Sequence, residues 1–335
     1  MITGSYARGV ADFPAVRLHV VSGKGGTGKT TVAAALALAL AHGGKRVLLV
    51  EVEGRQGLAQ LFDVPPLPYQ EKKVAVAPGG GDVYALAVDA EDALLDYLHM
   101  FYKISPNGIP ARTLRKVGAI DFATTIAPGV RDVLLTGKIK EVVTRKDGTR
   151  PWYDAVVVDA PPTGRIGRFL NITQQVGGIA KVGPLKAQSD GVMGVLRSKV
   201  TAVHLVTVLE EMPVQETLDA VQELRGLELP VGGVVVNMVR PPELSPAYLL
   251  AAERGELDVD ALEQGLKQVG LDPTLAPDLA REASEHAARV ALEERGRDAL
   301  HGSDRPTYEL PQLPEVDLGS LYELASLLRE QGMTR

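Results

Sequence analysis

The sequence predicts an α/β fold with a mostly parallel, doubly wound sheet. Short apolar runs of strand length recur along the chain, and helical patterns separate most of them. The runs are continuously apolar, which is typical of strands that helices cover on both faces. A glycine-rich segment joins the first run to the first helix. The predicted strands are residues 17–22, 45–53, 83–88, 155–158, 203–209 and 231–238.

The first predicted unit is a βαβ crossover. A helix rich in Ala and Leu follows the first strand from about Lys29 to His42, and Gly43 and Gly44 lie in the C′ position that glycine favours. The strand at 45–53 comes next, so the crossover is right-handed by default. A later helix is expected over 214–224.

We expect one domain over residues 17–335, preceded by a flexible lead-in over 1–16. Residues 91–147 and 166–200 hold helical patterns broken by Gly and Pro and are too long for connecting loops. They are predicted to form an inserted helical subdomain at the active edge of the sheet. Residues 253–300 are charged and Ala-rich and predict solvated helices. A final helix is expected to dock on the core through one face that carries Leu318, Leu321, Leu324, Leu327 and Leu328.

Composition excludes several classes of protein. Of 335 residues, 45% are hydrophobic and 23% charged, which is typical of a globular chain. There is no Cys, so disulfides, thiolate zinc sites, Fe–S clusters and cysteine nucleophiles are excluded. The net charge of −6 and the absence of a long apolar segment or signal peptide predict a cytoplasmic protein with no nucleic-acid partner and no stable membrane insertion.

The glycine-rich segment carries the strongest chemical signal. Gly23, Gly28, Lys29 and Thr30 satisfy G-x-x-x-x-G-K-[ST] between a predicted strand and helix, which predicts a P-loop NTPase. Backbone N–H groups and the helix N-terminus would bind phosphate, Lys29 would reach the β/γ oxygens, and the Thr30 hydroxyl would ligate Mg²⁺. The motif therefore predicts Mg²⁺ and a nucleoside triphosphate as cofactors. The remaining predicted nucleotide contacts are Gly25, Gly26, Thr27 and Thr31.

The same letters also fit a dinucleotide motif. Gly23, Gly25 and Gly28 satisfy G-x-G-x-x-G, and Glu53 ends the next predicted strand, where a ribose-binding acid would lie. The Lys29-Thr30 pair and a second acidic strand end favour the P-loop over this oxidoreductase alternative.

That second strand end is Asp159, which follows the apolar run 155–158. An Asp at the carboxyl end of a buried strand can hold a Mg²⁺-bound water beside a P-loop. The Pro-Pro-Thr-Gly run that follows suits a loop that senses the γ-phosphate. A plain surface turn is the simpler alternative for this run, and the P-loop disfavours it.

Lys24, two residues after Ser22, is the signature lysine of the deviant Walker A class. Together these motifs resemble the anion-transporting ATPase family, which includes the arsenite-pump ATPase and the targeting factor for tail-anchored membrane proteins. The resemblance extends from about residue 17 to 331. It implies that Glu53 stands in place of the Asp that orients the attacking water, one methylene longer.

The resemblance implies further site residues. Residues 159–164 match the second switch, with Arg165 where a His is usual, and 128–129 resemble a helical-subdomain motif. Asn237 matches an adenine-contacting Asn, and residues 311–314, with Pro311 and Leu313, lie where the family closes over the base. Arsenite activation and a shared zinc depend on cysteines and are not implied here.

The function expected from these features is a Mg²⁺-dependent ATPase that works as a nucleotide switch. It would be a homodimer or a heterodimer with a paralogous ATPase, and slow hydrolysis would control a client surface on the helical subdomain. The expected catalytic residues are Lys24, Lys29, Glu53 and Asp159, with Lys24 acting across the dimer interface. A non-hydrolysing nucleotide-binding subunit of a heteromeric complex and a partition-type ATPase are the alternatives.

Overall fold

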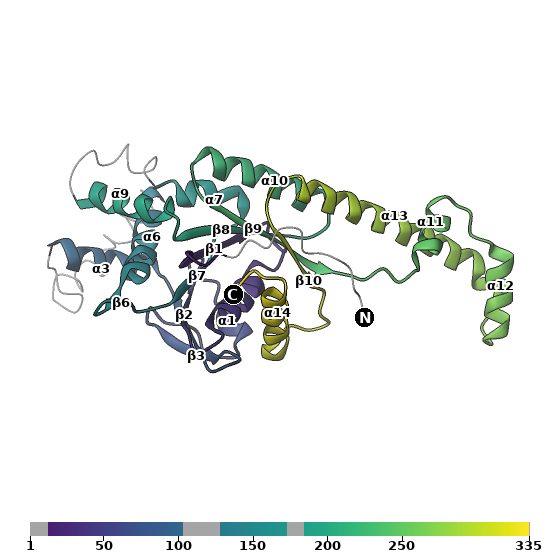
Figure 1. Cartoon of the computed structure of the whole chain (residues 1–335), viewed down its shortest axis with the longest axis horizontal. Helices are drawn as coiled ribbons and strands as arrows, with labels where there is room; N and C mark the ends of the chain where they lie inside the picture. The colour runs from purple at the N-terminus through teal and green to yellow at the C-terminus, as the bar shows by residue number, and fades with distance from the viewer. Residues whose placement is uncertain (1–12, 103–127, 173–183, 335) are drawn as a thin grey trace.

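The computed structural model describes residues 13–102, 128–172 and 184–334. Within them, eight strands form one sheet in the order β10-β9-β8-β1-β7-β2-β4-β3 (Figure 1). Neighbouring strands are parallel except β3 and β4, which are antiparallel. The predicted α/β fold is confirmed. The strands are β1 Leu18–Gly23, β2 Arg46–Glu51, β3 Lys72–Val76, β4 Asp82–Ala87, β7 Ala155–Asp159, β8 Thr201–Thr207, β9 Val231–Val239 and β10 Thr307–Pro311, with a separate hairpin of β5 Lys146–Asp147 and β6 Arg150–Pro151.

Helices cover both faces of the sheet. One face packs against α1 and α14, and the other against α6, α7 and α10. The helices are α1 Lys29–Ala41, α2 Gly57–Leu61, α3 Ala90–Tyr102, α6 Pro128–Thr144, α7 Thr163–Leu170, α9 Pro184–Leu196, α10 Glu211–Gly226, α11 Pro246–Glu253, α12 Val259–Gln268, α13 Ala276–His301 and α14 Leu318–Glu330, and a short 3₁₀ helix, η1, spans Pro273–Leu275.

Two helices on one face explain why the chain's Ala-rich segment is buried. Helix α1 is apolar on all sides, and its Ala side chains let the sheet and α14 approach closely. Leu321, Leu324 and Leu328 of α14 are buried in the same cluster, so the predicted docking of the C-terminal helix is confirmed.

The strands at the two edges of the sheet were not predicted. β3 has the sequence KKVAV with two exposed lysines, and β10 ends on a proline. Lysine and proline are typical of edge strands, because they discourage further pairing, but they weaken the apolar pattern. The strand predicted at 45–53 ends earlier, at Glu51, so Glu53 lies in the loop that follows.

Helices occupy the described parts of the two stretches predicted as a helical subdomain. These are α3, α6, α7 and α9, whereas residues 103–127 and 173–183 lie outside the described residues. Between β9 and β10, α11, α12, η1 and α13 form an arm that projects beyond the sheet (Figure 1). The helices predicted over 253–300 are present there.

Two buried histidines link neighbouring strands of the sheet. His19 on β1 and His204 on β8 are almost fully buried, with His19 Nδ1 3.0 Å from His204 Nε2. Because the amide of Gly233 donates to His204 Nδ1, Nε2 of His204 carries the proton and donates to His19. Burial lowers the pKa of His19 to about 4 and that of His204 well below its usual value. Both rings are therefore neutral at pH 7.

We expect the free energy of unfolding to fall as the pH falls from 6.5 towards 4. In that range the two histidines become protonated in the unfolded chain but stay neutral in the folded protein. Each pH unit therefore lowers the free energy of unfolding by up to about 1.4 kcal/mol per histidine. His19→Asn should flatten this slope when urea unfolding is measured at pH 7, 6 and 5. The control is His301→Asn at an exposed position, and an unchanged slope in His19→Asn would contradict the assignment.

Candidate functional site

The candidate site begins at the loop between β1 and α1. Thr27 Oγ1 donates to the carbonyl of Lys24 at 2.9 Å and closes the loop, while Gly25 and Gly26 lie exposed at its top. Helix α1 starts at Lys29, so its N-terminal amides face the space that the loop encloses. Thr31, in the first turn of α1, is half-buried. This arrangement suits a phosphate chain.

At two positions of the loop, neighbouring atoms leave no room for a side chain larger than that of glycine. A Cβ on Gly23 would lie 2.1 Å from the carbonyl oxygen of Val206 on β8. Gly28 has a φ of +81°, and a Cβ there would lie 2.3 Å from Nδ2 of Asn237. Only glycine allows the loop to pass this close to β8 and β9.

Asp159 at the end of β7 meets the start of α1. Thr30 Oγ1 donates to Asp159 Oδ2 at 2.7 Å, and Ser22 Oγ donates to the carbonyl of Pro161 at 2.6 Å. Burial raises the pKa of Asp159 to about 6, against the opposing effects of Thr30 and Lys29. A desolvated carboxylate beside a hydroxyl is a hard-oxygen donor pair, and a divalent cation would relieve its charge. The residues therefore fit Mg²⁺.

The two acids after β2 have different environments. Glu51 is buried, and its carboxylate accepts from the amides of Gln56 at 2.5 Å and Leu58 at 3.2 Å. Glu53 lies two residues further on, with Oε1 3.4 Å from Arg165 and Oε2 3.6 Å from Arg55. Glu53, Arg165 and Pro161 also line a cavity of about 180 Å³. Glu51 thus holds the loop, and Glu53 borders the cavity beside the segment predicted as the second switch.

Lys24 forms an ion pair within its own chain. Its Nζ lies 2.8 Å from Oε1 of Glu216 on α10, and Thr163 at the start of α7 donates to the same carboxylate at 3.3 Å. Glu216 therefore joins the P-loop to the segment predicted as the second switch. No sequence motif marks Glu216, because it is one of several acids on α10.

Asn237 closes the far side of the loop. Its Nδ2 donates to the carbonyl of Thr27 at 3.0 Å, and the side chain is 5% exposed. A primary amide has two N–H groups and a carbonyl, so this bond uses one of its three polar positions. Asn237 also borders a cavity of about 210 Å³, next to the phosphate loop. The other polar residues that line it are Glu210, Arg240, Arg289, Glu293 and Gln312.

The residues at the end of β10 that were predicted to contact the base lie in two different environments. Pro311 ends β10, and the amide of Gln312 donates to the carbonyl of Val239 at 2.9 Å. Gln312 lines the cavity beside Asn237, whereas Leu313 packs against the cluster that holds α1 and α14. In this conformation Gln312, which lies within the predicted segment 311–314 but was not named as a contact, lies closer to the predicted base site than Leu313 does.

Comparison with known proteins agrees with this geometry. The sequence profile described as "Anion-transporting ATPase" matches residues 16–197. ATPase BagA of Mycobacterium tuberculosis is 57% identical over 323 residues, which cover 95% of this chain and 94% of BagA. The chain belongs to the anion-transporting ATPase family. The predicted family and the predicted enzyme class, an ATPase, are confirmed.

More distant relatives carry the names of two branches of this ATPase family. A "Putative arsenical pump-driving ATPase 2" of Aquifex aeolicus is 24% identical over 268 residues, or 72% of this chain and 86% of that protein. An "ATPase get3" of Schizosaccharomyces pombe is 25% identical over 252 residues, or 65% of this chain and 72% of that protein.

The structure brings most of the predicted site together at the carboxyl ends of the parallel strands. The loop from Gly23 to Thr30 contacts Asp159 through Thr30 and Asn237 through Thr27. Sequence reasoning missed Glu216 as a site residue. Among the described helices, none is long and apolar enough to cross a bilayer.

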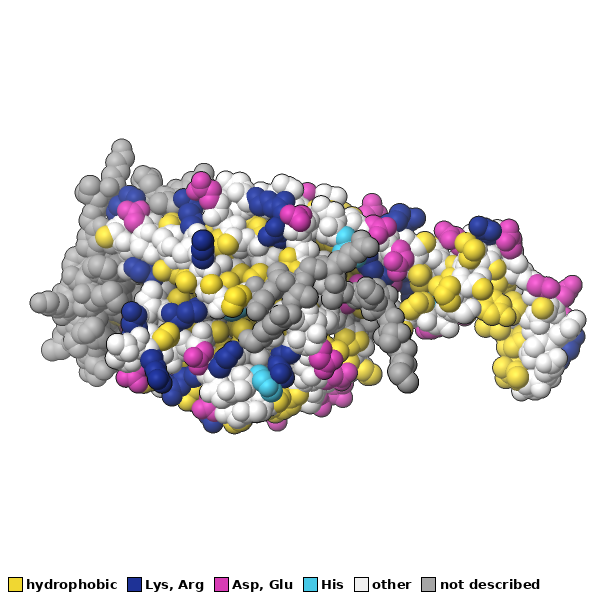
Figure 2. Space-filling view, in the orientation of Figure 1, with side chains coloured by type: hydrophobic (Ala, Val, Ile, Leu, Met, Phe, Trp, Pro, Cys, Tyr) yellow, Lys and Arg dark blue, Asp and Glu magenta, His cyan; other side chains and the backbone are white. Residues whose placement is uncertain are grey.

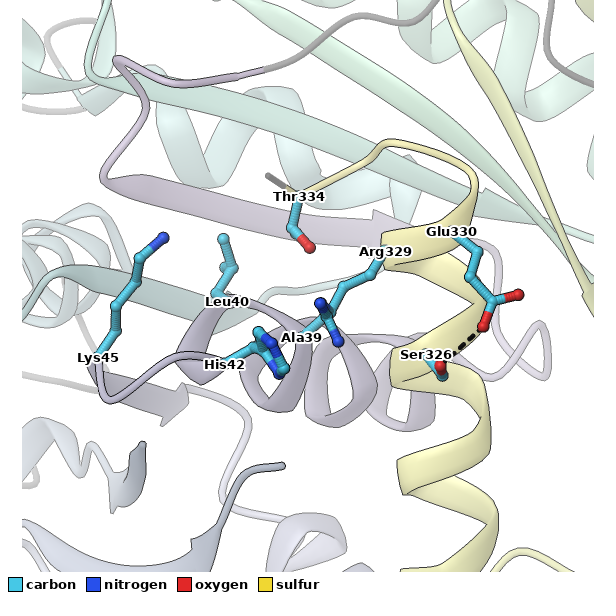
Figure 3. Close-up of a pocket in the computed structure, with 8 residues that line it drawn as sticks. All are labelled: Ala39, Leu40, His42, Lys45, Ser326, Arg329, Glu330 and Thr334. Atoms are coloured by element: carbon cyan, nitrogen blue, oxygen red, sulfur yellow. Dashed lines mark hydrogen bonds between the residues drawn. The ribbon is translucent and has the colours of Figure 1, made fainter. Parts of the chain in front are cut away.

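A larger cavity, of about 430 Å³, lies far from this site. It borders the opposite end of α1 and the last turn of α14, with His42, Lys45, Arg329 and Thr334 around it (Figure 3). Ser326 donates to Glu330 at its rim at 2.9 Å. None of the predicted nucleotide contacts of this ATPase lines the cavity.

Proposed function

We propose that this ATPase works in the cytoplasm as a Mg²⁺-dependent dimeric switch that couples ATP binding and slow hydrolysis to the binding of a protein client. The observation that carries the proposal is the pair of contacts Thr30–Asp159 and Ser22–Pro161. They join the phosphate loop directly to the loop at residues 159–164. A γ-phosphate and Mg²⁺ bound between the two would change both loops together.

In this proposal the chain's own residues divide the chemistry. Lys29 and the amides of the loop bind the phosphates, Thr30 and Asp159 hold Mg²⁺, Asp159 through a water, and Glu53 orients the attacking water. When bound, Mg²⁺ would neutralise negative charge on the phosphates. Lys24 would leave Glu216 and reach the nucleotide of a second subunit, identical or paralogous. The helices around α6 and α9 would form the client surface.

ATP with Mg²⁺ should stabilise the protein by mass action. At a hundredfold excess over Kd the free energy of unfolding should rise by about 2.7 kcal/mol, which thermal unfolding would detect as a higher Tm. Lys29→Ala should abolish the shift, and NAD should give none. Stabilisation by NAD and not by ATP would overturn the phosphate-loop assignment, and turnover by the purified chain separates the switch from a non-hydrolysing subunit.

A further inference from the structure

In the arm between β9 and β10, small apolar side chains are mostly buried, whereas several large ones are exposed. Helices α11 and α12 pack on α13, and three of the five apolar residues buried in these helices are alanines: Ala252, Ala276 and Ala287, with Leu266 and Leu300. Six large apolar side chains are exposed instead. They are Tyr248, Leu250, Val269, Leu271, Leu275 and Leu279, each between 39% and 70% exposed.

Those side chains lie on a part of the chain that makes few other contacts. Figure 2 shows hydrophobic side chains gathered over the arm, where it extends away from the body of the molecule. A scattered exposed leucine needs no explanation, but six large apolar side chains within 32 residues of one protruding element mark an interaction surface. We name the six the apolar arm surface.

The net negative charge of the protein is concentrated in residues 241–280, which include α11 and α12 of the arm. Residues 241–280 contain eight acidic and two basic side chains, a net charge of −6. The formal charge of the whole chain is also −6, so the remaining residues are balanced. Acids such as Glu253, Glu256 and Asp260 are exposed beside the apolar arm surface. The charge is thus concentrated where the apolar side chains are.

This charge decides which partner fits. An anionic lipid surface and a nucleic acid would be repelled. A second arm would bring the same negative charge, and the rest of a second copy is neutral overall. A segment with an apolar face bordered by Lys and Arg satisfies both features, because its apolar side chains cover the leucines and its cations meet the acids.

We propose that the apolar arm surface docks a basic amphipathic helix of a partner protein. Val269, Leu271, Leu275 and Leu279 would take the apolar face, and the acids of residues 253–278 would steer the helix and fix its orientation. This surface lies apart from the client surface proposed around α6 and α9. The inference does not depend on ATP turnover.

The test uses the full chain and three labelled 18-residue model helices, followed by fluorescence anisotropy. The first carries Leu on one face and Lys on the other; the second has Glu for Lys, and the third Ala for Leu. We expect the first to bind in the micromolar range and the other two at least tenfold more weakly. Equal binding of the Glu helix, or no binding of the Lys helix, would overturn the proposal.

Matched variants locate the surface. Leu271→Ser with Leu275→Ser should weaken binding of the Lys helix at least tenfold, whereas Leu292→Ser, at a 51% exposed position of α13 outside the acidic segment, should leave it unchanged. Glu253→Gln with Glu256→Gln should weaken binding and reduce its salt dependence. Unchanged Tm and ATPase rates would show that the variants remain folded.

A photo-crosslinking residue at Val269, which is 70% exposed, tests the native partner in cells. Sequencing of the crosslinked peptide should give a segment with leucines on one face and Lys or Arg beside them. A crosslink to an acidic or uncharged segment would overturn the proposal. So would a crosslink to another copy of this chain together with a dimer that the Leu271/Leu275 variant dissolves.

Discussion

Lys24→Ala should lower the rate of ATP hydrolysis by about 10³-fold while ATP binding stays nearly normal. A cation supplied by a second subunit at phosphoryl transfer is worth that much or more in arginine-finger systems. In the single chain, Nζ of Lys24 is paired with Glu216 at 2.8 Å. Hydrolysis and ATP affinity are measured separately, by phosphate release and by nucleotide titration.

Mixing two inactive variants tests whether Lys24 acts between subunits. Lys24→Ala contributes an intact phosphate loop and Lys29→Ala contributes Lys24, so a mixed dimer should regain one working site. If the chain pairs with a paralogue, Lys24 of that paralogue is the residue to replace. A confirmed mixed dimer without recovered hydrolysis would mean that Lys24 acts within its own chain or not at all.

Glu216 provides a matched control for this mechanism. Glu216→Gln removes the charge that holds Lys24 but keeps a side chain of the same shape beside Thr163. If Lys24 must leave Glu216 to act, this variant should hydrolyse ATP faster than the natural chain, and Lys24→Ala should cancel the gain.

Glu53→Gln should keep ATP affinity and lower turnover by about 10²-fold or more, because positioning a proton acceptor is worth 10²–10⁴ in rate. Glu51→Gln should act differently. Its carboxylate accepts hydrogen bonds from two backbone N–H groups. In Gln, an NH₂ group would replace one of the two oxygens and would point its own N–H groups at a backbone N–H. The expected cost is about 1–3 kcal/mol of stability.

Steady-state kinetics and urea unfolding of both variants separate the two acids. A large loss of turnover in Glu51→Gln without loss of stability would make Glu51 the residue that orients water. Unchanged turnover in Glu53→Gln would remove Glu53 from the mechanism and leave the loop without a general base at that position.

The parts of the site that were predictable are those whose geometry follows from local sequence. The phosphate loop is contiguous, and Asp159 follows from the rule that parallel strands end at one edge of a sheet. The Lys24–Glu216 pair was not predictable, because it joins residues far apart in the chain through the packing of α10. Glu53 was placed at a strand end because its run looked continuous, yet β2 stops at Glu51, where the carboxylate turns to cap α2.

In the arm, the sequence predicts the helices but not which of their apolar side chains are exposed. Its helices follow from the pattern of residues 253–300, but periodicity cannot tell an exposed leucine from a buried one in a thin element with no sheet beneath it. Only the packing of α11 and α12 on α13 shows that alanines make up most of the small interior and that Leu250, Leu271, Leu275 and Leu279 remain exposed.

Helix α13 connects the arm to the body of the protein. It spans 26 residues, about 39 Å at 1.5 Å per residue, and its middle part carries Arg289 and Glu293, which line the cavity beside Asn237. Its body-side portion packs on α10, the helix that presents Glu216 to Lys24. A partner that moved α13 would therefore affect both this cavity and the Lys24–Glu216 pair. By linkage, whatever factor a docked partner applies to ATP affinity, ATP must apply to the affinity for that partner.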